Sequence, residues 1–241
     1  MSRNQTDRII YNGNDLSKIV CCKVRRPIMA DVEIKSEQVP GRYGEIFKSA
    51  RRSGYDLPVE MWLRTSDRRD VAELRHRLAA ALWSDEPAPL YLPDDPTKYL
   101  LAIVSGSTDL DEITDDCPCA TVTFRVCDPD YFGEHRRIDV RSGSVCFDAG
   151  GSRPAHLCIT AKPGSCSSWR VTNRDTGEFI NVTGKLTDTS TVRVDMALER
   201  TTINQQTAAV SIDSDYFEIR GRCHLEISSG TATLEWEERW L

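Results

Sequence analysis

Short segments that alternate apolar and polar side chains recur through the second half of the chain, and this pattern constrains the fold more than any other feature. Each segment has four to six residues and is rich in side chains that favour strands. Gly, Asn, Asp and Ser separate the segments at intervals of mostly about 8–14 residues, as in an antiparallel β-sandwich. We therefore predict strands over residues 144–147, 155–160, 169–172, 179–182, 191–195, 208–212, 223–227 and 232–236.

The first half combines similar segments with strong turn signals. Asn12 and Gly13 form one sharp turn, because both residues tolerate positive φ, and residues 40–44 form a second, glycine-rich bend. The apolar and β-branched segments between the turns predict strands over residues 9–11, 19–24, 31–34, 59–64, 99–105 and 121–127.

A helix over residues 67–84 interrupts this β pattern. Its apolar residues Val71, Leu74, Leu78 and Leu82 recur at helical spacing. Ser66 or Asp67 can cap its first amides, and prolines follow its end at positions 87 and 89. We expect one long helix within an otherwise β-rich half.

Together these patterns predict a mainly β protein of two domains. The first, over residues 1–138, is α+β with the one long helix, and the second, over residues 139–241, is an antiparallel β-sandwich. The boundary falls where charged residues crowd, between 134 and 142. The last strand either stays in the second domain or returns to the first.

Charge and hydropathy exclude several classes of protein. The net charge of −6 disfavours a protein whose main task is to grip nucleic acid, which needs clustered Lys and Arg. No apolar run approaches the ~18 residues that span a bilayer, and the first residues lack the apolar core of a signal peptide. We therefore expect a soluble protein made in the cytoplasm, without a membrane partner.

The nine cysteines do not form a recognisable disulfide framework. Their number is odd and their spacing irregular. Most lie in strand-like stretches beside apolar residues, where a free cysteine behaves as a small apolar side chain. We expect reduced, mostly buried thiols, except in the loop of Cys117 and Cys119, where exposed reduced thiols are favoured.

A catalytic centre requires a cluster of reactive groups, and the sequence offers none that is convincing. Cys223 and His224 are adjacent, so in a strand they point to opposite faces and cannot share a proton. His156 and Cys158 share a face, and with Cys146 or Cys166 could hold zinc, yet no paired ligand spacing supports a metal. We assign no catalytic, cofactor-binding or metal-binding residue, and leave a metal-dependent hydrolase as a remote alternative.

Several phrases, taken in order, resemble one family. In the first half these are residues 11–16 (YNGNDL), 39–44 (VPGRYG), the helix ending near Trp83, residues 92–102 (LPDDPTKYLLA) and 124–133 (FRVCDPDYFG). Residues 189–195 (TSTVRVD) and 232–240 (ATLEWEERW) follow in the second half. The order is similar to that of the distal tail proteins of long-tailed, non-contractile bacteriophages. Members commonly carry Gly-Arg-Asp-Gly within residues 39–44, and this chain departs from that motif with Tyr43 in place of the aspartate.

The resemblance implies an architecture and a set of partners. It implies a hexameric ring, single or as two stacked rings, closed by the first domains, with galectin-like second domains outside. Its neighbours would be the tail tube protein and the tail-associated, fibre-bearing hub protein, and the tape measure protein and DNA would pass through its opening. The ring would lie at the distal end of the virion tail, after assembly in the cytoplasm of the bacterial host, and would not be an enzyme.

Two sets of residues are candidate binding sites. Arg51, Arg52, Arg68 and Arg69 interrupt an acidic chain, and we hypothesise that they pair with a neighbouring copy in the ring. The alternative function is a carbohydrate-binding module that recognises cell-surface glycans. For that function, Trp169, Trp236 and Trp240 would stack on sugar rings, although a tryptophan in a sandwich is more often in the core.

Overall fold

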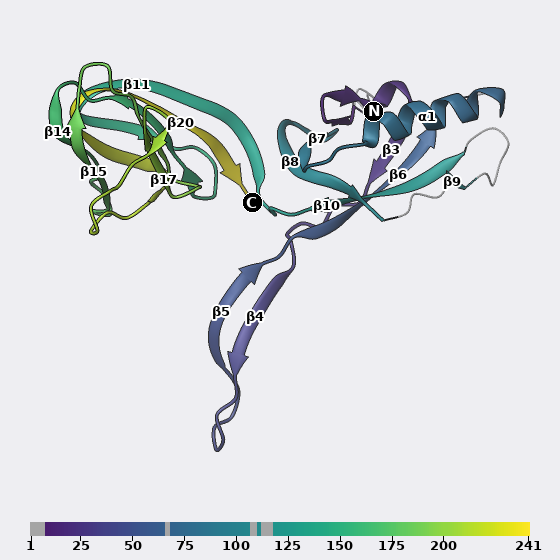
Figure 1. Cartoon of the computed structure of the whole chain (residues 1–241). Coiled ribbons are helices and arrows are strands. Elements are labelled where there is room, and N and C mark those ends of the chain that lie inside the picture. The colour runs from purple at the N-terminus through teal and green to yellow at the C-terminus, as the bar shows by residue number, and fades with distance from the viewer. Residues whose placement is uncertain (1–7, 66–67, 107–109, 112–117) are drawn as a thin grey trace. The chain divides into compact units, whose positions relative to one another are not determined.

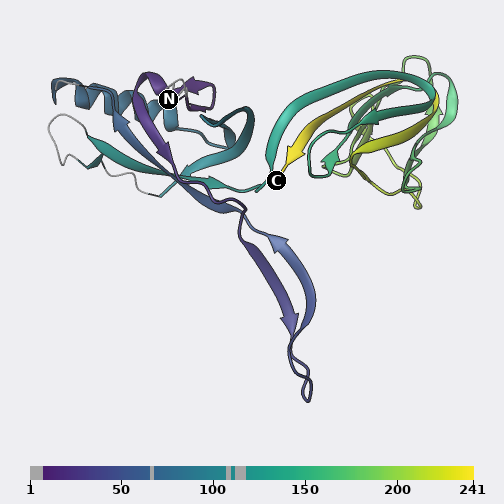
Figure 2. The same cartoon turned by 180° about the vertical axis from the view of Figure 1, so that it is seen from behind.

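The computed structural model describes residues 8–65, 68–106, 110–111 and 118–241. Over these residues the protein consists mainly of antiparallel strands with a single α-helix, which confirms the mainly β class. The chain divides into two compact units, up to residue 131 and from residue 132, each with its own core (Figures 1 and 2). Strand β11 (Tyr131–Asp148) runs through residue 138, where we predicted the first domain to end. No described helix has the length and apolar content needed to cross a membrane.

The first unit is built on an antiparallel sheet. Its strands lie in the order β7 (Ala88–Leu92), β8 (Asp95–Ser105), β10 (Cys119–Val126), β6 (Tyr55–Leu63) and β3 (Val20–Val24). β1 (Ile10–Tyr11) pairs with β7 and with β2 (Asn14–Asp15), and β9 (Leu110–Asp111) pairs with β10. The predicted turn between β1 and β2 is confirmed, since Asn12 and Gly13 have φ of 47° and 75°. Alternate residues of β6 enter the core: Leu57, Val59, Met61 and Leu63.

The predicted helix is present but shorter. A 3-10 turn η2 (Arg68–Asp70) leads into α1 (Val71–Leu82), whose residues Val71, Leu78 and Leu82 are buried. Asp70 stands at the N-cap and makes no side-chain capping bond, while the predicted caps Ser66 and Asp67 lie outside the described residues. The helix ends where the N–H of Trp83 donates to the Ala79 carbonyl, 3.1 Å away, and Trp83 turns to an extended conformation.

The second unit is a β-sandwich. One layer runs β18 (Gln206–Thr207), β17 (Arg200–Ile203), β16 (Val192–Asp195), β13 (Cys158–Lys162), β20 (Arg222–Trp240) and β11. β15 (Phe179–Leu186) pairs with β14 (Cys166–Asn173), and β14 also pairs with β20. β12 (Ala155–His156) and β19 (Glu218–Ile219) form a small separate ladder. The core between the layers includes Trp169, Phe217 and Trp236.

One long strand serves both layers, where the sequence predicted two strands. β20 pairs with β14 through residues 225–227 and with β13 through residues 231–235. Gly230 lies between these stretches with a φ of 76°, and a Cβ there would be 2.0 Å from the Lys162 carbonyl oxygen. Because only glycine fits both the dihedral and the close approach, Gly230 lets β20 pass from one layer to the other.

The predicted strand over residues 208–212 is wrong. Only Val210 forms a bridge there, with Val182. The hydroxyls of Ser211 and Ser214 bond to each other at 2.9 Å, and the N–H of Ser214 donates to the Ser211 carbonyl. These local bonds turn the backbone and compete with a continuous ladder.

Candidate assembly surface and ligand pocket

Strands β4 (Val32–Glu37) and β5 (Ile46–Arg52) form a hairpin that is a separate two-stranded sheet (Figure 1). The glycine-rich bend predicted at residues 40–44 lies between the strands, with φ of 82° at Gly41 and 80° at Gly44. We did not predict β5, because its charged residues conceal the alternation. The hairpin contributes nothing to either core among the described residues.

The pairing register gives the hairpin two unlike faces. Residues paired across an antiparallel ladder share a face, so Ile34 lies with Ala50, and Ser36 lies with Phe47. Val32 adds a further apolar group, and Ile34 and Phe47 are 65% and 63% exposed. The opposite face carries mostly charged groups, including the pair of Glu33 and Arg51. We call the face of Val32, Ile34, Phe47 and Ala50 the apolar hairpin face.

Ion pairs connect the two ends of the hairpin to the rest of the first unit. Arg52, the last residue of β5, pairs with Asp130, and the two side chains are 16% and 6% exposed. In the segment between β3 and β4, Arg26 pairs with Asp94 and donates to the Tyr131 hydroxyl at 3.1 Å. Burial raises the pKa of neighbouring Tyr55, and Tyr131 raises it further, so this phenol stays protonated at neutral pH.

The predicted arginines do not form a single patch. Arg51 is exposed on the charged face of the hairpin, whereas Arg52 lies on the other face and pairs with Asp130 inside the chain. Arg69 is exposed beside the start of α1, and the side chain of Arg68 lies outside the described residues. Of the hairpin pair, Arg51 is therefore the one whose charge faces solvent.

Two of the three tryptophans proposed to stack on sugars belong to the core. Trp169 is fully buried and its Nε1 donates to the Ser229 carbonyl, while Trp236 is 4% exposed and donates to the Ala149 carbonyl at 2.8 Å. Their ring faces are covered by other side chains, so the stacking role is wrong for both. Trp240 is half-buried at the end of β20. Trp83, which we did not select, is 73% exposed.

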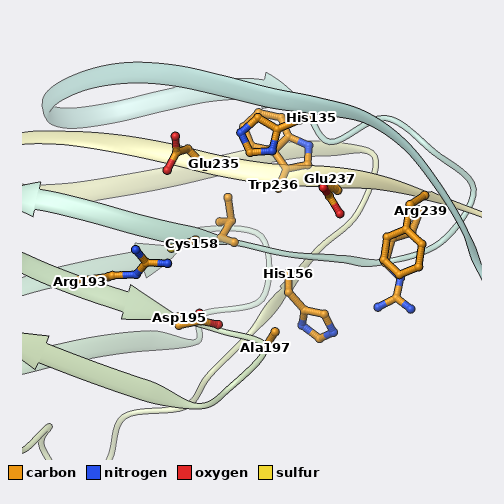
Figure 3. Close-up of a pocket in the computed structure, with 12 residues that line it drawn as sticks. His135, His156, Cys158, Arg193, Asp195, Ala197, Glu235, Trp236, Glu237 and Arg239 are labelled. Atoms are coloured by element: carbon orange, nitrogen blue, oxygen red, sulfur yellow. The ribbon is translucent and has the colours of Figure 1, made fainter. Parts of the chain in front are cut away.

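A pocket of about 520 Å³ lies within the second unit, on the face of β16, β13 and β20 that points away from the core (Figure 3). Cys158 of β13 pairs with Asp195 of β16 on one side and with Glu235 of β20 on the other. The three side chains therefore form a row across the sheet. Further polar side chains surround this row: His135, His156 and Arg193. At one wall the Arg239 guanidinium lies 5.1 Å from the Phe132 ring centre.

The floor of the pocket is a neutral thiol. Burial raises the pKa of Cys158, and the charges of Asp195 and Glu235 raise it further against the opposing effect of Arg193. The thiol therefore stays protonated at neutral pH and is a poor nucleophile or metal ligand. The Nε2 atom of His156 lies 3.5 Å from Oε1 of Glu218. No group of three or more metal-ligating side chains occurs in the described part of the chain.

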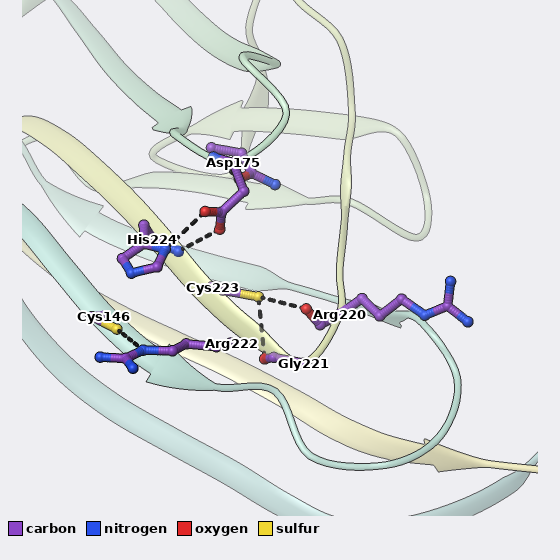
Figure 4. A network of polar contacts seen from close by, with 8 residues as sticks. Cys146, Asp175, Arg220, Gly221, Arg222, Cys223 and His224 are labelled. Atoms are coloured by element: carbon purple, nitrogen blue, oxygen red, sulfur yellow. Dashed lines mark hydrogen bonds and ion pairs between the residues drawn. The ribbon is translucent and has the colours of Figure 1, made fainter.

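The start of β20 shows why the Cys223–His224 pair is not a catalytic dyad (Figure 4). Cys223 is buried and its Sγ contacts the Arg220 carbonyl, whereas His224 is exposed and its Nδ1 lies 2.8 Å from Asp175. The predicted opposite orientation is confirmed. Cys146 is exposed and its sulfur accepts a bond from Arg222.

Burial differs among the cysteines more than we expected. Cys127 is exposed like Cys146, so the expectation of buried thiols is wrong at both positions. Cys119 begins β10 and is half-buried, so the expectation of an exposed loop thiol is wrong there, while Cys117 lies outside the described residues.

Each unit matches a family model of phage tail proteins. Residues 12–126 match the phage tail protein RIFT-related domain, and residues 150–240 match the C-terminal domain of the siphovirus-type tail component. A chain that carries both domains in this order is a structural component of a siphovirus tail. It belongs to the Dit-like distal tail proteins, which confirms the resemblance seen in the sequence.

Solved structures share the fold over nearly the whole chain. The crystal structure of phage SPP1 Dit, described as a paradigm of the hub adsorption apparatus in phages that infect Gram-positive hosts, has a TM-score of 0.84 and 18% identity, covering 97% of this chain and 99% of that one. Chains of the phage p2 baseplate, solved with Ca and with Sr, have TM-scores of 0.56 and 0.58 and identities of 9% and 8%; each match covers 96% of this chain and 97% of the baseplate chain. At such identities the likeness concerns the fold. No curated protein matches the chain by sequence.

Proposed function

We propose that the protein forms a ring, with six copies, that joins the tail tube to the host-adsorption apparatus at the distal end of the tail. Membership of the distal tail family supports a tail-tip location. The partners would be the tail tube protein above and the fibre-bearing hub protein below, and the tape measure protein and DNA would pass through the opening. Assembly would take place in the cytoplasm of the bacterial host.

The apolar hairpin face is the observation that carries self-association. Ile34 and Phe47 are each more than 60% exposed, and they lie on the same face of a sheet that packs on neither core among the described residues. Exposed apolar patches of this kind mark interaction surfaces. A closed ring needs a contact in which one patch of a subunit meets a different patch of the next. The hairpin offers the first patch, with Arg51 on its charged face available for pairing at the rim.

Light scattering on a sizing column tests the ring. The full chain should elute at about six times its 27.2 kDa mass, or twelve times for two stacked rings, and negative-stain images should show a central hole. A double change of Ile34→Ser and Phe47→Ser should shift the mass towards the monomer. Both side chains are already exposed, so the thermal midpoint of the isolated subunit should change little.

The matched control changes the opposite face of the same strands. Lys35→Ser with Ser49→Ala alters a pair of the charged face and leaves the apolar hairpin face intact. This control should keep the mass of the unmodified protein. A ring that persists when both apolar residues are serine, or a chain that is monomeric at every concentration, would contradict assembly through this face.

A further inference from the structure

The pocket of the second unit is built by the regular pairing of three neighbouring strands. Asp195, Cys158 and Glu235 occupy one row, and strands lie roughly 4.8 Å apart, so the backbones of the two acidic residues are roughly 10 Å apart. Cys158 stands between them and is the smallest side chain of the row. The hollow over this row is therefore a consequence of register and of a small residue at the centre.

The lining groups are suited to hydrogen bonding on several sides. Asp195 and Glu235 are half-buried acceptors, and Arg193 supplies donors beside them. His135 and His156 can donate or accept. The Asp195 carboxylate is already fixed by the N–H of Leu198 at 3.0 Å, which orients its second oxygen. Phe132 also lines the pocket, with the Arg239 guanidinium over its ring.

The balance of charge selects the class of ligand. Acidic groups and basic groups both line the pocket, so neither an anion nor a cation meets a uniform field. A neutral molecule with many hydroxyls can donate to the carboxylates and accept from the guanidinium at once. Planar, charged side chains that engage vicinal hydroxyls fit a sugar ring.

We propose that this pocket binds a neutral saccharide unit, with Asp195, Glu235 and Arg193 as the hydrogen-bonding groups and Cys158 as the floor. Buried Trp236 borders this pocket, but the hydrogen-bonding groups, and not a stacked tryptophan ring, would hold the glycan. The proposal does not depend on ring formation, because every residue of the pocket belongs to one copy of the chain.

The test uses ligand-detected NMR and calorimetry on the full chain. The probes are glucose, galactose, rhamnose, N-acetylglucosamine and N-acetylgalactosamine, with glycerol 3-phosphate as the anionic comparator. We expect saturation transfer to at least one neutral sugar and a measurable affinity. Glu235→Gln should weaken that affinity at least about tenfold, because it removes one charged acceptor.

Two substitutions at one position provide the matched comparison. Cys158→Phe fills the hollow and should abolish binding, whereas Cys158→Ser is slightly smaller, leaves the hollow open and should retain binding within about threefold. Thermal unfolding verifies that both variants are folded. No binding of any neutral sugar, equal binding by Cys158→Phe, or binding of glycerol 3-phosphate alone would overturn the proposal. Light scattering of the same samples separates this result from any failure of the ring.

Discussion

Arg51 and Arg52 are neighbours in the sequence, and strand β5 places them on opposite faces. Their substitutions should therefore have very different effects on the free energy of unfolding. Arg52→Ala leaves the buried Asp130 carboxylate without its guanidinium partner. We expect a loss of about 3 kcal/mol in the free energy of unfolding, at the lower end for a buried pair because Arg52 retains some contact with water. Arg51→Ala, on the exposed face, should change it by less than about 0.5 kcal/mol. Urea unfolding of both variants decides, and equal losses would contradict the distinction.

Among single residues, the core position of the tryptophans could be predicted from the sequence, whereas the ion pair of Arg52 could not. Trp169 shares strand parity with Val171, and Trp236 shares it with Leu234, so period-two alternation already places both rings inward. The partner of Arg52 lies 78 residues away, and no local pattern contains such a separation. The row of Asp195, Cys158 and Glu235 is equally non-local, because it depends on register between three strands.

Among elements, long periodic segments were predicted well and transitions poorly. The stripe of α1 was clear, but its start was not, since Asp70 occupies the N-cap without a side-chain bond. The two strands predicted around Gly230 are one, because that glycine bends the strand without ending it. β5 was missed because Lys48, Arg51 and Arg52 give it a polar composition. An exposed two-stranded hairpin does not need the apolar periodicity by which buried strands are recognised.

The turn that docks on β20 should respond to acid. Asp175 accepts from the backbone N–H and the imidazole of His224, and these contacts hold the pKa of Asp175 below its ordinary value of 3.8. A carboxyl whose folded pKa is depressed stabilises the fold above the unfolded pKa and loses that contribution as pH falls through the folded pKa. Docking should therefore be complete above about pH 5 and be lost progressively below pH 3.8.

Amide hydrogen exchange of His224, followed against pH, measures this docking. After correction for intrinsic exchange, protection should fall only in acid. Asp175→Asn keeps the shape of the side chain and removes its titration, so its protection should be lower and independent of pH in the acid range. A pH-dependent loss that survives in Asp175→Asn would assign the effect to another group.

For the whole molecule, the order of features was more informative than any one of them. Each sequence phrase is short, and none identifies the family alone. The order of the phrases along both halves pointed to the family, and two family models match the same two stretches of the chain. Assembly is harder to predict from the sequence, because an interface depends on which apolar groups remain exposed after folding. The apolar hairpin face became visible only when Ile34 and Phe47 were seen to lie outside both cores.

The two separate cores predict two thermal transitions. Trp169 and Phe124 are both fully buried, the first in the core of the second unit and the second in that of the first. Trp169→Ala should cost about 3–5 kcal/mol in one unit only, and Phe124→Ala a similar amount in the other. Since 1 kcal/mol shifts the midpoint by roughly 4–8 °C in a domain of 60–100 residues and by somewhat less in larger units, each variant should lower one calorimetric transition by about 10 °C. A single transition lowered equally by both changes would mean that the units unfold together, in which case their cores act as one cooperative structure.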